Sequence, residues 1–267
     1  PSPLTVNAGT GNVTFSDRVG WIKPLKSLTV SGTTAINGKQ VTTTEGQTYN
    51  GPVTLGATTD LESTQSSLQL DSSISYNQAI SAALNIRAQK DITLNGAIEA
   101  LDGALAVTMT ANNLGTNNNT GTITLNSPVT TRGGAITLTA SSGMTFNGAP
   151  LNTGGTTGAG AISLTNTSSG DIIAATTDAA MTTGGGNITV TNNSTSNPAS
   201  GVISLQDLTG GNITINNNMP NLPAGNSVMV TLNKPIRGGG TISVNSVRGD
   251  ILVNGAITGA GSPVSVT

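Results

Sequence analysis

Apolar and polar positions alternate in short runs along most of this chain. The recurring unit is an aliphatic residue, a Thr or Ser, and a second aliphatic residue. A period of two places the aliphatic side chains on one face of a β-strand and the hydroxyl on the other. The unit occurs at Ile123–Leu125, Ile136–Leu138, Ile162–Leu164, Ile188–Val190, Ile213–Ile215 and Ile242–Val244. Asp91–Ile98 returns almost unchanged as Asp250–Ile257. The pattern predicts one short strand repeated many times.

The repeats follow one another at a nearly constant interval. The first residues of successive units are Ile136, Ile162, Ile188, Ile213, Ile242 and Val264, so the steps are 26, 26, 25, 29 and 22 residues. Each step holds two or three short strands separated by Asn-Gly or Gly-Gly corners, where Gly and Asn accept the left-handed backbone that turns need. We therefore predict an all-β fold, a parallel β-helix (β-solenoid) with about 22–29 residues per coil.

The repeat is strict from residue 91 to residue 267 and looser before it. We expect residues 1–90 to be a less regular solenoid part that continues into 91–267 and holds a candidate cap or docking segment near its Pro-rich start. Strands are predicted there at Leu4–Val6, Val13–Phe15, Leu28–Val30, Val53–Leu55, Leu68–Leu70 and Leu84–Ile86. One helical turn over Ser75–Leu84 is the alternative, because Tyr76, Ile80 and Leu84 are four residues apart.

Three Asn-rich pieces interrupt the repeat and are predicted to be loops at corners. They are Asn112–Asn119, Asn192–Asn197 and Asn216–Asn221. The chain starts at Pro1 without a Met and stops at Val264–Thr267, within a strand unit. Both ends are expected to be cuts through a longer array.

Composition narrows the function classes. The chain has no Cys and no His, 2% aromatic residues, 8% charged residues and a net charge of −2. These numbers provide no disulfide framework, no thiolate or imidazole chemistry and no basic face for nucleic acid. No apolar run approaches the roughly 18 residues of a membrane-spanning helix. No cofactor is predicted.

One tripeptide, Arg248-Gly249-Asp250, matches an integrin-type receptor motif and is a weak receptor-binding candidate. However, Asp also precedes a strand at Asp91 and Asp171. An Asp at this place can accept hydrogen bonds from corner amides. The structural interpretation of Asp250 is therefore favoured over receptor binding.

Two acidic residues, Asp60 and Glu62, flank Leu61 and are expected on one face of a strand. Paired carboxylates are what glycoside hydrolysis requires. No acidic cluster recurs on adjacent coils, so a solvated face is favoured and we expect no catalytic residue.

The remaining site types are also disfavoured. Asp171 and Asp178 are too isolated to supply the six to eight oxygens that Ca²⁺ prefers. The run Gly184–Gly186 lacks the spacing of a nucleotide-binding loop. Outward threonines such as Thr137 and Thr139 suggest an ice-binding solenoid, but the irregular spacing and the intruding Asn and Ser argue against it.

Two longer stretches, Glu45–Ala57 and Leu84–Ile98, resemble repeats of filamentous-haemagglutinin-type bacterial exoproteins, which are often exported by two-partner secretion. The resemblance covers most of the chain. It implies a right-handed β-helical shaft, a place outside the cell or on the bacterial surface, and a role in adhesion.

We therefore expect a structural shaft of an extracellular fibre or adhesin, with no catalysis. Its expected partners are further copies of the repeat or of itself, joined end to end. The second hypothesis is a filament or sheath subunit that assembles in this way. The third is direct binding of host glycans or receptors by the Asn-rich loops with Trp21, Tyr49 or Tyr76.

Overall fold

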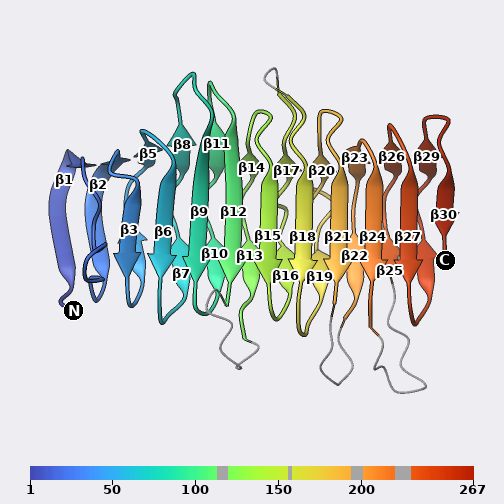
Figure 1. Cartoon of the computed structure of the whole chain (residues 1–267), viewed down its shortest axis with the longest axis horizontal. Coiled ribbons are helices and arrows are strands. Elements are labelled where there is room, and N and C mark those ends of the chain that lie inside the picture. The colour runs from blue at the N-terminus through green and yellow to red at the C-terminus, as the bar shows by residue number, and fades with distance from the viewer. Residues whose placement is uncertain (113–119, 156–157, 194–200, 220–229) are drawn as a thin grey trace.

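Parallel β-sheets make up all the regular structure that the computed structural model describes. The described residues are 1–112, 120–155, 158–193, 201–219 and 230–267, and none of them is helical. Three sheets run the length of the molecule and form a right-handed parallel β-helix of about nine turns (Figure 1). The predicted fold class is confirmed.

The three sheets are here named A, B and C. Sheet A contains β1 (Leu4–Phe15), β2 (Leu28–Ile36), β4 (Gln47–Tyr49), β5 (Val53–Leu55), β8 (Ile74–Tyr76), β11 (Ile98–Ala100), β14 (Val129–Thr130), β17 (Leu151–Asn152), β20 (Met181–Thr182), β23 (Leu208–Gly210), β26 (Ile236–Gly238) and β29 (Ile257–Gly259). Sheet B contains β3 (Gln40–Thr43), β6 (Thr59–Ser63), β9 (Ala82–Ala88), β12 (Leu105–Ala111), β15 (Ile136–Ala140), β18 (Ile162–Asn166), β21 (Ile188–Asn192), β24 (Ile213–Asn217), β27 (Ile242–Ser246) and β30 (Val264–Val266). Sheet C contains β7 (Leu68–Leu70), β10 (Ile92–Leu94), β13 (Ile123–Leu125), β16 (Met144–Phe146), β19 (Ile172–Ala174), β22 (Ile203–Leu205), β25 (Val230–Leu232) and β28 (Ile251–Val253).

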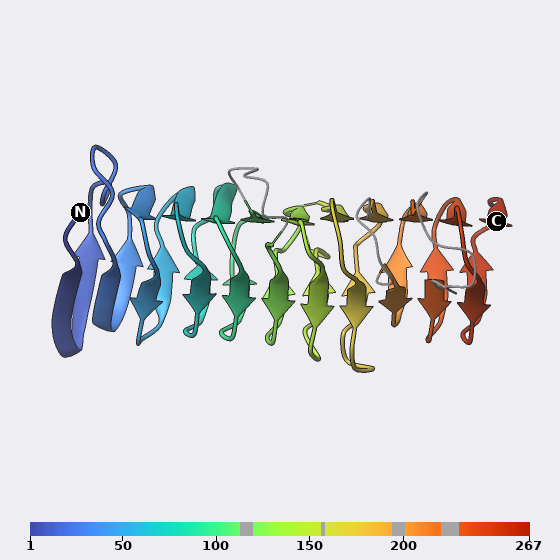
Figure 2. The same ribbon diagram turned by 90° about the horizontal axis from the view of Figure 1, so that it is seen from below.

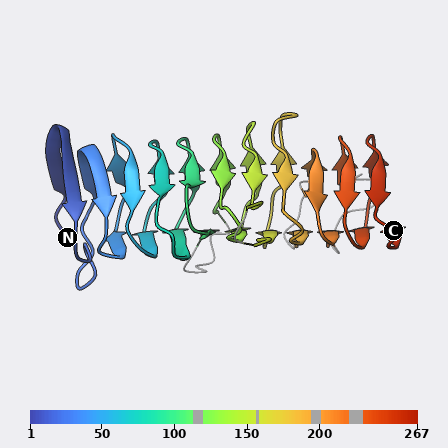
Figure 3. The same cartoon turned by 90° about the horizontal axis from the view of Figure 1, so that it is seen from above.

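Each coil from β6 onward passes through sheet B, then C, then A, before the chain returns to B. The coils follow one another along a single axis, with the two termini at opposite ends of the rod (Figures 2 and 3). Ile136 pairs with Ile162, and Ile162 pairs with Ile188, as the predicted stacking requires. Along sheet B from β9, paired residues are between 22 (Ile242 to Val264) and 29 residues apart (Val107 to Ile136).

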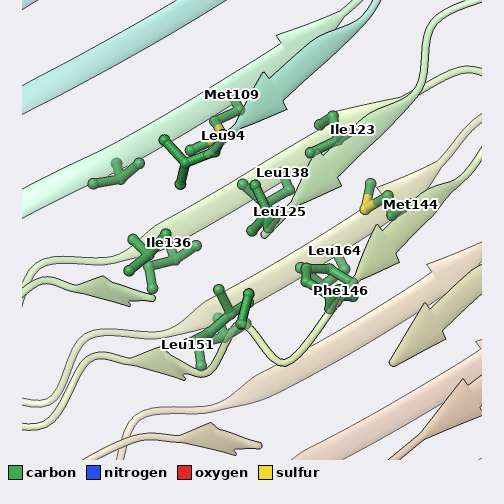
Figure 4. Packing of buried hydrophobic residues seen from close by; sticks show 14 of the residues in the cluster. Leu94, Met109, Ile123, Leu125, Ile136, Leu138, Met144, Phe146, Leu151 and Leu164 are labelled. Carbon is green, nitrogen blue, oxygen red and sulfur yellow. The ribbon is translucent and has the colours of Figure 1, made fainter. Parts of the chain in front are cut away.

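The inward side chains of all three sheets fill one continuous apolar column. Figure 4 shows ten of them, including Met109 from sheet B, Ile123 from sheet C and Leu151 from sheet A. Ile136, Ile162 and Ile188 are fully buried by their neighbours in adjacent coils. Each such aliphatic contributes about 1.5–3 kcal/mol when fully buried. Because a single coil cannot bury them, stability comes from stacking.

Close approach between coils explains two of the corner glycines. Gly238 ends β26, and a Cβ placed on it would lie 2.7 Å from Cγ1 of Ile242. Gly185 lies at a corner with φ of +109°, a left-handed conformation that side chains rarely adopt. The Gly runs thus serve the corners, as predicted.

The first part of the chain differs from the rest in its strands. β1 is 12 residues long, and β2 pairs with both β4 and β5. Residues 16–27 form an excursion that pairs with β3 through Val19 to Val41 and Leu25 to Thr43. This excursion therefore covers the β3 edge of sheet B. The alternative helical turn over Ser75–Leu84 is wrong, because β8 ends at Tyr76 and β9 begins at Ala82.

The Asn-rich pieces divide between strands and undescribed residues. Residues 113–119, 194–197 and 220–221 of the predicted loops lie outside the described residues. The prediction is wrong for Asn192 and Asn216, which belong to β21 and β24.

Buried asparagines instead seal the corner after sheet B. The Asn166 side-chain amide donates to the carbonyls of Ser169 (2.7 Å) and Gly170 (3.0 Å) and to Oδ1 of Asn192 (3.0 Å). Its own Oδ1 accepts a hydrogen bond from the Gly143 N–H at 3.0 Å. The amide side chain therefore satisfies backbone groups that the turning chain leaves unpaired.

Candidate functional surfaces

Aspartates before sheet C strands hold the next coil in place. Asp91 Oδ1 accepts hydrogen bonds from the backbone N–H (2.9 Å) and the hydroxyl (2.8 Å) of Thr122. Asp171 Oδ1 accepts from the N–H groups of Gly201 (2.6 Å) and Val202 (2.8 Å). The structural role predicted for an Asp at this place is confirmed at both positions.

The tripeptide Arg248-Gly249-Asp250 lies in the exposed turn between β27 and β28. Gly249 has a φ of +94°, and the Arg248 carbonyl accepts a hydrogen bond from the Ser246 hydroxyl at 2.9 Å. The Asp250 carbonyl accepts from the Val230 N–H at 3.1 Å. The tripeptide is therefore accessible, while its backbone is part of the regular corner, so receptor binding through it stays a prediction.

The acidic pair Asp60 and Glu62 projects outward from β6 on either side of the buried Leu61, as predicted. Arg87 on the neighbouring β9 lies 3.5 Å from Asp60 and 4.0 Å from Glu62. The Asn85 amide also donates to Asp60 Oδ1 at 2.6 Å. Both carboxylates thus have a cationic neighbour on the surface of sheet B, which favours the interpretation as a solvated face.

Metal ligands do not gather in the described part of the chain. No group of three or more acidic, His or Cys side chains there is close enough to hold an ion. The described residues also contain no helix of the length and apolarity needed to cross a membrane.

The aromatic residues proposed for glycan binding have different fates. Tyr49 and Tyr76 are buried, with Tyr49 donating a hydrogen bond to Gln47 Oε1 at 3.0 Å and Tyr76 to the Ile80 carbonyl at 2.7 Å. Burial raises the pKa of Tyr49 above its ordinary value. The prediction that these two tyrosines contact a ligand is wrong, because both rings belong to the interior.

Trp21, by contrast, is 56% exposed on the excursion at residues 16–27. It lines a hollow of about 330 Å³ together with Asp17, Arg18 and Lys39 and with Ser16, Asn37 and Gly38. The Arg18 guanidinium lies over the Trp21 ring, 5.4 Å from its centre. Lys39 has a φ of +70°, a conformation uncommon for a residue other than Gly. The hollow combines an open aromatic ring with two cations.

Two columns of outward side chains cross six neighbouring strands of sheet B, from β12 to β27. The first column is Thr108, Thr137, Ser163, Thr189, Thr214 and Ser243, and the second is Thr110, Thr139, Thr165, Thr191, Asn216 and Asn245. We call these residues the threonine array. Each residue is paired directly with its neighbour in the next coil, and none is charged.

Comparison of the chain with protein-family models, with curated proteins and with solved structures yields no match. The functional argument therefore depends on the molecule's own surfaces.

Two features of these surfaces could not be found by reading along the chain. The hollow joins Trp21 to Lys39 across the bridge between Val19 and Val41, and only the uneven charge of the first ninety residues indicated it. The threonine array is regular in space although its repeats are irregular in sequence. The signal was present in the i, i+2 spacing of Thr within each strand.

Proposed function

We propose that this chain is a shaft segment of an extracellular bacterial fibre or adhesin, and that it carries no catalytic residue. The observation that carries the proposal is the unbroken parallel pairing of sheet B from β3 to β30. Neighbouring parallel strands are about 4.8 Å apart, so nine turns make a rod of roughly 45 Å. A rod of this kind holds attached parts at a set distance.

The surface supports the same proposal. Threonine, serine and asparagine cover the outward face of sheet B from β12 onward. Corner loops are short, and the described backbone is paired from coil to coil, which leaves few sites for proteases. In this proposal the chain lies outside the cell or on its surface, and further repeats are its neighbours.

The proposal is tested by electron microscopy and by labelling of intact cells. We expect the purified chain to form separate rods of constant length at all concentrations, and antibodies against it to label unpermeabilised cells. Filaments that lengthen with concentration would instead favour the end-to-end subunit. Labelling that requires permeabilisation would contradict an extracellular shaft.

The Trp21 hollow favours glycan binding as a second candidate function. A sugar ring packs on an open indole face, and Arg18 and Lys39 match the carboxylates of uronic acids. The volume lies near the lower end of the roughly 300–1,000 Å³ typical of ligand pockets.

The chain contains a single Trp, so its fluorescence reports on this hollow directly. We expect titration with an oligouronate to change the emission, and Lys39→Gln to weaken binding several-fold. Lys90→Gln is the matched control, because Lys90 is an exposed cation that does not line the hollow. No change in emission, or equal effects of both variants, would rule the candidate out.

A further inference from the structure

The threonine array has the properties of a surface that orders water. Its twelve residues are all half-buried and point away from the apolar column. Among the described residues, no protein group forms a hydrogen bond with the hydroxyls of its eight threonines: Thr108, Thr110, Thr137, Thr139, Thr165, Thr189, Thr191 and Thr214. These hydroxyls are therefore available to solvent.

The pairing of the strands turns these side chains into a grid. Neighbouring parallel strands are about 4.8 Å apart, and alternate residues along one strand are about 6.6 Å apart. Both spacings are close to repeats between oxygen atoms in the lattice of hexagonal ice. Between β12 and β27 the register continues without a bulge. The strands also remain nearly parallel from β9 to β27 in Figure 1. The grid is therefore regular in both directions.

Irregular spacing along the chain does not disturb this grid. Thr108 and Thr137 are 29 residues apart and Ser163 and Thr189 are 26 apart, yet each pair lies side by side. The corners and the connections through sheets C and A absorb the difference in length. The argument from irregular spacing against an ice-binding face is therefore wrong.

Threonine suits such a grid better than a longer polar residue. Its β-branch restricts χ1, so its methyl and hydroxyl groups occupy few positions. A rigid array loses little conformational entropy when it contacts a solid. The absence of charge in the array also avoids the tightly hydrated ions that would break an ordered water layer.

We propose that the threonine array binds crystalline water, and that the chain adsorbs to ice through sheet B. The best part of the grid lies on β12, β15, β18 and β21, where the second column is Thr110, Thr139, Thr165 and Thr191. Ser163 is the single residue of those four coils that departs from threonine.

The test uses the full chain and two readouts, thermal hysteresis and inhibition of ice recrystallisation. We expect both activities in the unmodified chain. Thr165→Tyr places a large ring in the middle of the array and is expected to reduce hysteresis at least several-fold. Thr145→Tyr is the matched control, because Thr145 points outward from β16 on sheet C, and it is expected to leave hysteresis unchanged.

A milder variant separates ice binding from folding. Thr139→Val keeps the shape of the side chain and removes its hydroxyl, so a partial loss of hysteresis with an unchanged circular dichroism spectrum is expected. The proposal is overturned if the unmodified chain shows neither activity, or if Thr145→Tyr lowers hysteresis as much as Thr165→Tyr. Neither result would affect the shaft, whose test depends on the rods and on cell labelling.

Discussion

Sheet B presents two different outward faces on one continuous ladder of strands. On β6 and β9 its two outward columns hold Asp60 with Glu62 and Asn85 with Arg87. On β12 the same columns hold Thr108 and Thr110, and hydroxyl or amide side chains continue from there. The inward columns are aliphatic throughout. The comparison teaches that inward residues determine the fold, while outward residues are free to change from charged to uncharged.

The largest expected effect concerns what the two regions share. Leu61 and Leu164 are both fully buried, one in each region. Replacing either with Ala removes buried methyl groups and leaves a cavity, which costs about 2–5 kcal/mol. Denaturant titration of Leu61→Ala and Leu164→Ala should show similar losses in the free energy of unfolding. Thr145→Ala on the outward face is the control, with a change within about 0.5 kcal/mol. A loss confined to one leucine would break the equivalence of the two interiors.

The next effect belongs to the regular region alone. Asn166→Ala leaves the Gly143 N–H and two corner carbonyls without their side-chain partner, which costs about 1–3 kcal/mol. Asn217 occupies the matching place two coils on, and its buried amide has no hydrogen-bond partner among the described residues. Asn217→Ala should therefore cost clearly less by the same titration. Equal losses would show that the hydrogen bonds of Asn166 contribute little.

A pH-dependent effect is expected in the first region. Burial raises the pKa of Tyr49 above its unfolded value of 10.0. Its contribution to stability is therefore complete below pH 10 and is lost as the pH rises further, because the unfolded state ionises first. Tyr49→Phe should cost about 0.5–1.5 kcal/mol at neutral pH through the lost bond to Gln47.

The same variant should lose less stability than the unmodified chain between pH 9 and about pH 12, when the free energy of unfolding is followed across this interval. Burial raises the pKa of Tyr76 as well, with a further contribution from Asp102, so some alkaline loss should remain. Identical alkaline profiles would show that Tyr49 does not titrate differently in the two states.

The smallest expected effect tests the charged outward face. Arg87→Met removes the cation beside Asp60 and Glu62 and should cost at most about 1 kcal/mol at low salt, since the three side chains are partly exposed. The loss should shrink as salt screens the two remaining carboxylates. Thr110→Met, on the same column one coil further, should show no salt dependence. A salt-independent loss at position 87 would assign the effect to packing instead.

The strands and their stacking could be predicted because Ile136, Ile162 and Ile188 carry a period that no other fold explains. The corners could not. Asn192 and Asn216 were predicted to be in loops because Asn favours turns, yet a solenoid also uses Asn within strands, where its amide pairs with turning backbone. The ring of Tyr49 was assigned to the surface because a chain so poor in aromatics gave no reason to expect a phenol inside.

The candidate surfaces required the register. Trp21 and Lys39 meet only because Val19 pairs with Val41, and no local pattern announces that bridge. Thr108 and Thr137 meet because a connection of unusual length closes on the same spacing as its shorter neighbours. Distances along the chain were therefore a poor guide to distances across the surface.

The stacking of coils also determines how the molecule responds to pulling. Its interstrand hydrogen bonds point along the long axis, so tension between the two ends loads the interface between coils directly. Coils at an end have the fewest neighbours and should detach first, one after another. Each detached coil of about 26 residues would add roughly 90 Å of extended chain. The rod would thus lengthen in steps under load and absorb a sudden force that a rigid link would transmit.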